Sequence, residues 1–563
     1  MSDYAQSPRP EPLHLVPPEL VSSPIAIPRR AGSPDLPVFM KDICFSATSS
    51  NYPQTPPLTS SLTMSASPAS PQFQSPLLRT PCEIIHKVLC SSGVRDPVGL
   101  ARAARTCKEL GSLIYESTDT ALWREIHLEL YDDPRLSGTV SGGRDVVWKR
   151  SVQQREFVGR ISREWSEERF GELPILLEPI CSILQGLYLD IPPTAAPSND
   201  TDSEMTDDSA SSISSSASAS SVDSLNIPLL EAILRSPIFA HLYYNHSYRA
   251  TRPTLRPLSG QTASPLRRQT REDIHPVLSM LHCLLPPDFD GEDEHHRTHR
   301  GYLREMVYTA SNYTEKNDWG PFNSDGEVDW RLLDALSSIM MANARDVIAL
   351  GEDSWRLALQ PLSFGLEAVR GWGWIDLRRP VDLEADDVWD WAGVEGTWCG
   401  SYAFLDYADW ITLNEPRIVA LRRQVGQLDL ARYAEAVGDL LHMHLTIDRP
   451  CDKSKDLLPP VTSGIPTGDL LPPIHFSGSS APTSAAWPSP AASSFVRGTV
   501  QLTADWPPQV RWTMVIRYGG EDRWKVEGVQ MGGRGSKRGF FGVWTDATKE
   551  LHSPNGPAWY WKT

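Results

Sequence analysis

One glycine-rich stretch has the composition of a phosphate-binding loop. It is "EGVQMGGRGSKRGFFG", 527–542, in which Arg534, Lys537 and Arg538 accompany the glycines. A nucleotide P-loop needs a glycine, four residues and then Gly-Lys-Ser/Thr between a buried strand and a helix. After Gly528 and the four residues that follow it, the chain reads Gly533-Arg534-Gly535, so the Lys-Ser/Thr step is missing. The "RGFFGVWTD" that comes next alternates like a strand. We therefore interpret the glycines as bulge and hairpin residues, and the three cations as a recognition loop for an acidic or phosphorylated partner.

Two groups of histidines have spacings that could bind a metal ion. In "DFDGEDEHHRTHRG", 288–301, His295 and His299 would share a helical face, and in "LHMHL" His442 and His444 share a strand face. The first stretch is polar, flanked by glycine and without thiolates, which favours a solvated loop. The second stretch has no obvious third histidine. We predict no metal site and no cofactor.

The cysteines, and the serine, histidine and aspartate residues, form no recognisable catalytic pattern. The eight cysteines include no Cys-x-x-Cys pair, which is typical of buried thiols in a reducing compartment. No Ser-His-Asp or Cys-His arrangement can be argued from spacing. The chain is therefore expected not to be an enzyme.

Charge and hydropathy limit the partners and the location. A formal net charge of -17 over 563 residues argues against general nucleic-acid binding, because phosphate contacts need a basic face. The N-terminus lacks the cationic and apolar segments of a signal peptide, and no stretch approaches ~18 apolar residues. We expect a soluble intracellular protein, cytoplasmic and/or nuclear, with no membrane partner.

Composition divides the chain into folded units and connecting segments. Three stretches rich in Pro, Ser or acidic residues are predicted to stay solvated, because they cannot bury enough apolar surface to offset the entropy of ordering. The predicted organisation is a disordered tail at 1–76, a small helical unit at 77–128, a helical extension at 129–192, an acidic Ser-rich linker at 193–225, a helical region at 226–385, and an antiparallel β domain at 390–563 with a Pro/Ser-rich insertion at 449–496.

The helical unit begins in "TPCEIIHKVLCSSGVRDPVGL", 80–100. Pro81 and the acidic Glu83 are typical of a helix start. Ile84, Ile85, Val88 and Leu89 form an apolar stripe at helical spacing. A second helix opens at Asp96-Pro97, and Leu122-Trp123 follows a polar turn. Three short helices bury little surface, so a partner often completes such a unit.

These residues resemble the F-box family in order and spacing. The matching elements are Pro81, Glu83-Ile84-Ile85, Val88-Leu89, Asp96, Leu100, Cys107-Lys108 and Leu122-Trp123. Thr80 and Pro97 depart from the family pattern, in which both positions are usually Leu. The resemblance covers 80–128 of the chain.

The resemblance implies that this unit binds a Skp-type adaptor, which docks the protein on a cullin–RING ubiquitin ligase. Another domain then selects an unknown protein substrate. The candidate adaptor-binding residues are Pro81, Glu83, Ile84, Ile85, Val88, Leu89, Leu100, Leu122 and Trp123. Some of these residues must instead form the core of the unit itself, and the sequence does not assign them.

The C-terminal unit changes to two-residue alternation. "GTVQLTADW" and "VRWTMVIRY" each place apolar residues on one side, and several similar segments follow the Gly-x-Trp at 396–398. Such half-buried antiparallel strands suit a closed barrel or a sandwich. The overall fold class is therefore α+β multidomain.

The Gly-x-Trp strand is similar to the first strand of lipocalin-like barrels. With "NDWGPF" at 317–322 before a long helix, the whole chain resembles fungal F-box proteins with a Trp-rich β C-terminus. Tryptophans and arginines have the composition of an interface hot spot, although barrel core is the simpler interpretation of any one tryptophan. The candidate substrate-binding residues are Arg511, Trp512, Arg517, Trp524, Arg534, Lys537, Arg538 and Trp544.

Two other function classes remain open. One is a ligand- or metal-binding β-barrel, or a barrel enzyme, that carries an F-box-like segment. The other is an F-box protein that acts outside a ligase as a structural adaptor. The leading hypothesis is a non-catalytic substrate receptor of an SCF-type ubiquitin ligase.

Overall fold

The structure is a computed structural model of the 563-residue chain. It describes residues 79–116, 121–136, 146–166, 168–169, 173–192, 224–245, 275–285, 294–360, 362, 366, 388–425, 430, 433, 435–449, 458–483, 494–532, 538–550 and 552–563. The predicted tail at 1–76 and nearly all of the predicted linker at 193–225 lie outside these residues.

The first described unit is helical, as the apolar stripe predicts. Its elements are α2 (Cys82–Arg95), α3 (Pro97–Ala104), α4 (Lys108–Gly111), the π turn η2 (Ser112–Glu116) and α5 (Ala121–Leu130). Pro81 is the N-cap of α2, and Pro97 lies in the first turn of α3, where a missing N–H costs nothing. The second predicted helix is two helices, because extended Cys107 (φ -154°, ψ 161°) separates α3 from α4.

The core of this unit forms where α2, α3 and α5 meet. Ile85, Leu89, Leu100 and Ile126 are buried there. Gly93 lies at this contact, and a Cβ at this position would lie 2.5 Å from Cδ1 of Ile126, so a larger residue would force the Ile126 side chain to shift. The helices thus approach more closely than a larger residue would allow.

The middle of the described chain is also helical. Its elements are α6 (Trp148–Glu164), α7 (Leu173–Leu189), α8 (Asn226–Leu234), α9 (Pro237–Ala240), η4 (His241–Asn245), α11 (Pro276–Leu284), α12 (Glu294–Tyr308), η6 (Ala310–Asn312), η7 (Glu315–Asn317), α13 (Trp330–Ala349) and α14 (Asp353–Leu359). Asp329 caps α13, as predicted, by accepting hydrogen bonds from the N–H groups of Arg331 and Leu332.

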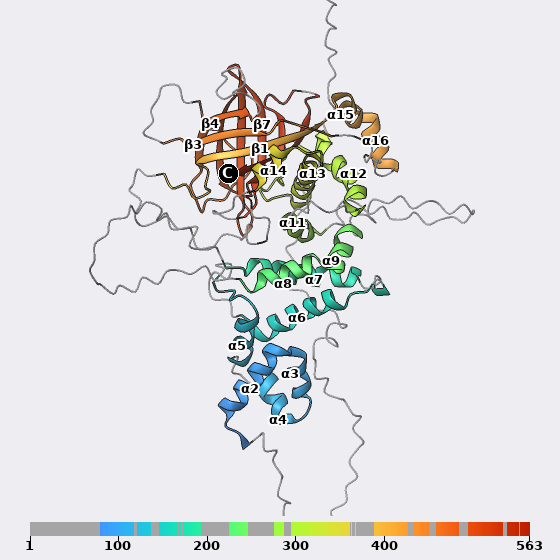
Figure 1. The fold of residues 1–563 in the computed structure, drawn as a ribbon, viewed down its shortest axis with the longest axis vertical. Helices are drawn as coiled ribbons and strands as arrows, with labels where there is room; N and C mark the ends of the chain where they lie inside the picture. The colour runs from blue at the N-terminus through green and yellow to red at the C-terminus, as the bar shows by residue number, and fades with distance from the viewer. Residues whose placement is uncertain are drawn as a thin grey trace, which may run out of the picture. The chain divides into compact units, whose positions relative to one another are not determined.

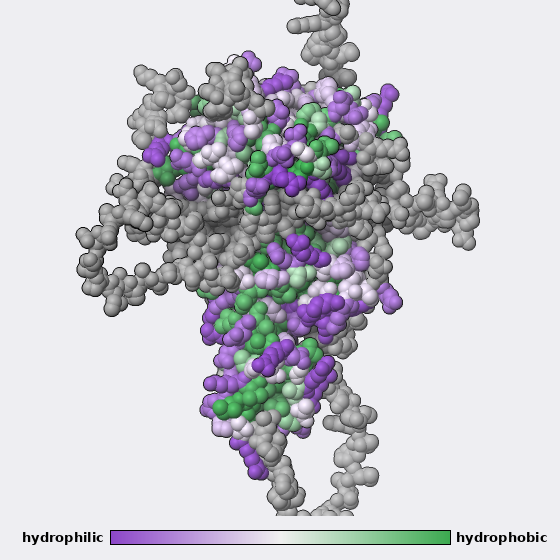
Figure 2. Space-filling view, viewed as in Figure 1, coloured by the Kyte–Doolittle hydropathy of each residue, from purple (hydrophilic) through white to green (hydrophobic). Residues whose placement is uncertain are grey.

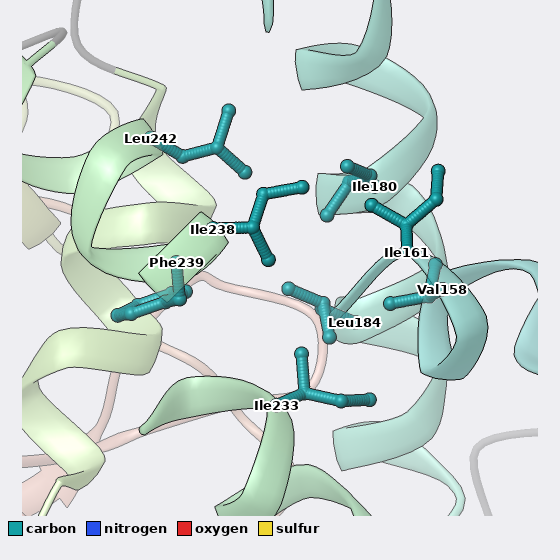
Figure 3. Close-up of a pocket in the computed structure, with 8 residues that line it drawn as sticks. All are labelled: Val158, Ile161, Ile180, Leu184, Ile233, Ile238, Phe239 and Leu242. Carbon is teal, nitrogen blue, oxygen red and sulfur yellow. The ribbon is translucent and has the colours of Figure 1, made fainter. Parts of the chain in front are cut away.

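The helices α6 to α9 and the turn η4 pack through an apolar junction (Figure 3). Its side chains point toward one another and leave no room for a water molecule between them. The lining residues are Val158, Ile161, Ile180, Leu184, Ile233, Ile238, Phe239 and Leu242. This junction is packed core and offers no ligand site.

The C-terminal unit is a closed antiparallel barrel (Figure 1), which decides between the two predicted β architectures. Eight strands form it, and a ninth, β2, pairs with one end of β1. Each barrel strand pairs with the next in the chain, and β9 closes the barrel by pairing Trp559 with Ser401. The strands are β1 (Gly396–Leu405), β2 (Glu435–Val437), β3 (Leu441–Ile447), β4 (Ile474–Pro482), β5 (Ser494–Leu502), β6 (Val510–Tyr518), β7 (Glu521–Gln530), β8 (Phe540–Asp546) and β9 (Asn555–Lys562). The helices α15 (Tyr407–Asn414) and α16 (Pro416–Val425) follow β1.

Side chains fill the described barrel interior. The Trp512 ring stacks on Phe540 at 4.6 Å and meets Trp398 edge-on at 4.9 Å. At the end of the barrel where β1 begins, Trp391 packs into the same core and donates its Nε1 hydrogen to the carbonyl of Pro472. The interior therefore resembles a packed core rather than a ligand-holding cup.

Two sequence expectations about loops and glycines are wrong. The predicted insertion at 449–496 contains the whole of β4, in which Gly478 is needed because a Cβ would lie 2.0 Å from the carbonyl oxygen of His444. Small and polar residues hide this strand from a hydropathy pattern. Gly528 forms no bulge, since pairing runs without interruption across it. It is a close-contact glycine, because a Cβ there would lie 2.9 Å from the Phe540 ring.

Helices cover one side of the barrel wall. Helix α13 contacts β8, β9 and β1, and the Trp561 indole donates to the carbonyl of Ala358 in α14 (Figure 1). Within the described part of the chain, no helix has the length and apolar character needed to span a bilayer.

Candidate interaction sites

Helix α2 separates its predicted adaptor-binding residues into two sets. Ile84 and Val88 project outward, with 49% and 53% of their surfaces exposed. Pro81 and Glu83 are exposed beside them. Exposed aliphatic residues one helical turn apart form a narrow apolar strip, which we call the α2 strip. Figure 2 shows hydrophobic residues gathered over this part of the molecule.

The other predicted adaptor contacts form the core of the unit. Ile85, Leu89, Leu100, Leu122 and Trp123 are all buried. The Trp123 indole donates a 2.7 Å hydrogen bond to the carbonyl of Ile114, which fixes the ring inside the unit. Substituting these residues removes core packing, so they no longer serve as candidate surface contacts.

The predicted substrate-binding tryptophans lie inside or at the end of the barrel. Trp512 is fully buried, and Trp544 is buried with its indole N–H donating to the carbonyl of Ala403. Trp524 is only partly buried and meets Trp544 edge-on at 5.1 Å, and the Arg523 guanidinium carbon lies 5.0 Å from the centre of the Trp524 ring. Trp524 is thus the one of these three tryptophans that remains accessible.

The predicted substrate-binding cations are also divided. Arg538 is buried and donates to the carbonyls of Leu284 and Leu285 at the end of α11, where a cation satisfies the last helical carbonyls. Arg517 is partly exposed on the β6–β7 hairpin and donates to the carbonyl of Gly520. Arg534 and Lys537 lie outside the described residues. Arg538 therefore anchors a helix and does not belong to an exposed cationic loop.

Arg511 lies in a buried cluster of charges on the outer wall of the barrel. Its guanidinium donates to Glu527 Oε2 at 2.8 Å and to Asp318 Oδ2 at 2.5 Å. Lys525 bridges the same two carboxylates, at 2.8 Å from Asp318 Oδ1 and 2.8 Å from Glu527 Oε1. Burial opposes ionisation of Asp318, but Lys525 and Arg511 hold the pKa of this carboxyl below its usual value. We call these four residues the wall cluster.

The "NDWGPF" segment positions the acidic part of this cluster. Asp318 and Trp319 both have left-handed backbone conformations, at φ 52° and 55°. Gly320 follows because a Cβ there would lie 2.7 Å from the Phe322 ring. Consecutive left-handed residues are unfavourable outside glycine, so the ionic contacts must stabilise this turn. The "NDWGPF" segment thus connects the helical region to the barrel through the ion pairs of Asp318.

Lys549 lies next to the wall cluster. Its Nζ lies 4.9 Å from the centre of the Trp319 ring and donates to Thr545 Oγ1. Burial, followed by repulsion from Lys525, lowers the pKa of Lys549 to about 8. Sequence reasoning missed this residue, because nothing in its local pattern indicates that the β8–β9 connection folds back onto Trp319.

Among the described residues, no three or more His, Cys, Asp or Glu side chains are grouped so that they could hold a metal ion. His442 and His444 point outward from β3, and Nδ1 of His442 lies 3.4 Å from the Cys399 sulfur. Burial raises the pKa of Cys399 to about 11, so its thiol stays protonated and is a poor nucleophile near neutral pH. This contact is therefore structural.

The predicted solvated loop around His299 is partly wrong. Residues from Glu294 onward form α12, and His299 is buried against Tyr243 and Tyr244. Its helix carries an apolar face, which the charged residues in the sequence obscure. His295 lies in α12, and its side chain is outside the described residues.

Sequence reasoning also missed a buried polar group in the helical region. Asp334 on α13 accepts hydrogen bonds from the Tyr243 hydroxyl at 2.6 Å and interacts with His282 Nδ1 at 2.7 Å. The signal was an aspartate between Leu333 and Leu336 of the apolar stripe. Because its partners come from η4 and α11, the arrangement joins three elements and needs no substrate to satisfy it.

Comparisons with known proteins add no relationship. No family model, no curated protein and no solved structure significantly matches this chain.

Proposed function

We propose that the chain is the substrate-recognition subunit of an SCF-type E3 ubiquitin ligase. In this proposal the helical unit at 77–128 binds a Skp-type adaptor, and through it a cullin–RING ligase. The lipocalin-like barrel binds a protein substrate. The chain itself supplies no catalytic residue, and it acts in the cytoplasm and/or the nucleus.

The observation that carries the proposal is the α2 strip. A small helical unit that buries Ile85 and Leu89 still exposes Ile84 and Val88 on the same helix. Exposed aliphatic residues on an element whose sequence resembles the F-box support adaptor binding, because burying them against a partner removes apolar surface from water. The resemblance of this unit to the F-box, in the order and spacing of its residues, is the reason to propose a Skp-type adaptor as that partner.

The ligand-binding alternative has less support. A small-molecule site in a barrel needs an interior cavity, whereas Trp398, Trp512 and Phe540 pack together inside the described barrel. We therefore favour an outer or end surface of the barrel for substrate binding.

The first prediction concerns the α2 strip. The double substitution Ile84→Asp/Val88→Asp should abolish co-purification with a Skp-type adaptor, because it places two charges in an interface that needs apolar surface. Calorimetric titration of the full chain with purified adaptor would measure the change, with at least a tenfold loss expected.

Val147→Asp is the matched control. Val147 is the N-cap of α6 and has 63% of its surface exposed, so the same chemical change should leave adaptor binding intact. Wild-type protein that does not bind any Skp-type adaptor, or a double variant that binds as well as wild type, would refute the proposed function.

A further inference from the structure

We propose that the outer face of β5 binds an extended Leu-Leu-Pro-Pro-type segment of the protein substrate, in competition with residues 458–461 of the chain itself. This inference rests on the proposed function and specifies the class of sequence that its substrate presents. The site consists of Arg497 and Thr499, which hold the chain's own segment, and of Phe495, which continues the same row of side chains.

A repeated tetrapeptide points to this site. The sequence Leu-Leu-Pro-Pro occurs three times, at 284–287, 457–460 and 470–473. The first and third copies contribute to the core, since Leu284 has 2% of its surface exposed and Leu471 has 4%. The second copy lies on the surface, where Leu458 has 36% of its surface exposed and both prolines are exposed. Core packing therefore explains the first and third copies but not the second.

The side chains of β5 hold this second copy through its backbone. Arg497 Nη1 donates to the carbonyl of Pro459 at 2.6 Å, and Thr499 Oγ1 donates to the carbonyl of Val461 at 2.7 Å. Donors and acceptors are both two residues apart, as expected where an extended segment follows the outward side chains of a strand. Both edges of β5 already pair with β4 and β6, so the segment at 458–461 lies on the face of the sheet. It is bound there as an extended peptide ligand would be.

The chain's own segment leaves the site incompletely filled. The buried Nε of Arg497 has no hydrogen-bond partner among the described residues. Two residues further along the same face of β5, Phe495 keeps 42% of its surface exposed. Since Pro459 lies at Arg497 and Val461 lies at Thr499, a ligand residue two positions before that of Pro459 reaches Phe495. A ligand that covers this ring removes more apolar surface from water than the chain's own segment does.

The chemistry of the site selects the class of ligand. Arg497 Nη2 donates to Asp522 at 2.7 Å, so the charge of the arginine is already balanced and the site favours a neutral carbonyl over an anion. Prolines lower the entropy that a segment loses when it binds in an extended conformation, and aromatic surfaces are their usual contacts. An apolar residue before the prolines matches Phe495.

Fluorescence anisotropy with the full chain tests the site. The labelled probe is the peptide LLPPVTSG, the sequence of residues 457–464, and the control probe is LLAAVTSG. The double substitution Pro459→Gly/Pro460→Gly makes the chain's own segment more flexible, so this segment should leave the site more often. The probe should bind the double variant about fivefold or more tightly than wild type, because a competing segment lowers the fraction of open sites.

Further substitutions in the double variant locate the site. Phe495→Ser should weaken probe binding about tenfold, and its side chain is exposed, so the fold should be retained. Arg497→Lys should also weaken binding, because it keeps the charge beside Asp522 but loses the planar donor group. Phe404→Ser is the matched control, since Phe404 is an exposed phenylalanine on β1, which does not pair with β5, and this change should leave binding unaltered.

Three results would each overturn the proposal: equal binding of the two peptides, probe binding that Phe495→Ser does not weaken, and equal affinity of the double variant and wild type for the probe. The proposed function fails separately. Phe495→Ser should bind the adaptor normally, and Ile84→Asp/Val88→Asp should leave probe binding unchanged. Adaptor binding without probe binding would therefore reject only this inference, and probe binding without adaptor binding would reject only the proposed function.

Discussion

Asp505 is a carboxyl group whose surroundings oppose its charge. It lies in the connection between β5 and β6, partly buried, and accepts hydrogen bonds from the N–H of Val328 at 3.0 and 3.2 Å. Burial raises the pKa of Asp505 to about 6, even though Thr503 and Val328 favour the charged form. The folded protein therefore holds this proton more tightly than the unfolded chain, which makes the residue a source of pH-dependent stability.

Asp505→Asn should stabilise the protein at pH 7.5 and have little effect at pH 4. When folding raises the pKa of an acid, that acid does not destabilise the folded protein below its unfolded pKa of about 4. As the pH rises from there towards 6, the acid loses its proton more readily in the unfolded chain, and the free energy of unfolding falls. The gain should be about 1–2 kcal/mol, since two pKa units are worth ~3 kcal/mol and partial exposure reduces this. Urea unfolding midpoints at both pH values measure it.

The exposed Asp469 supplies the control for this change. Asp469→Asn should shift neither midpoint, because its carboxylate is exposed to solvent. A loss of stability of the same size at both pH values in Asp505→Asn would contradict the explanation, because it would indicate a broken hydrogen bond instead of a released charge.

At the scale of elements, one buried carboxylate joins α12 to the barrel. The Glu435 side chain on β2 is completely buried, and its Oε2 accepts hydrogen bonds from Arg300 at 3.0 Å and Arg304 at 3.1 Å. Its Oε1 accepts from the Tyr308 hydroxyl at 2.9 Å. These three donors recur along one face of α12, so a single three-residue strand holds two turns of helix.

Glu435→Gln should destabilise the contact between α12 and β2 by about 3–5 kcal/mol, because it removes the buried negative charge that Arg300 and Arg304 share, although Arg300 keeps its ion pair with Asp346. Hydrogen exchange of α12 amides should become faster, and the thermal midpoint should fall. The exposed Glu415 provides the matched control, and Glu415→Gln should change neither. Unchanged exchange in Glu435→Gln would show that the arginines find other partners.

At the scale of the whole molecule, adaptor binding and barrel folding should be separable. The α2 strip is solvent-exposed, whereas barrel closure depends on β1 pairing with β9. Ile84→Asp/Val88→Asp should therefore leave the near-ultraviolet circular dichroism of the Trp-rich barrel unchanged. Trp123→Ala should unfold its own unit, at a cost of about 3–5 kcal/mol. A changed barrel spectrum in the surface double variant would mean that the two regions fold together.

Local patterns in the sequence were sufficient for several of the elements. Alternating apolar residues located the segment that forms β6 to the residue, and Asp329 marked the start of α13, because strand and helix periods and caps depend on neighbours in the chain. The elements that escaped this reasoning include β4, with its glycine and serines, the three-residue β2, the helices α15 and α16, and the start of α12.

Tertiary structure decided which side chains are accessible. The pattern could not show that Ile85 is buried while Ile84 is exposed, or that Arg538 donates to the last carbonyls of α11. Both depend on contacts between segments that are far apart in the chain. The same holds for Lys549 and Trp319, which come from different elements and meet only in the folded protein. Periodicity is local and can be derived from residue order, whereas the pairing of charges and the choice of exposed face are set by the packing of the whole chain.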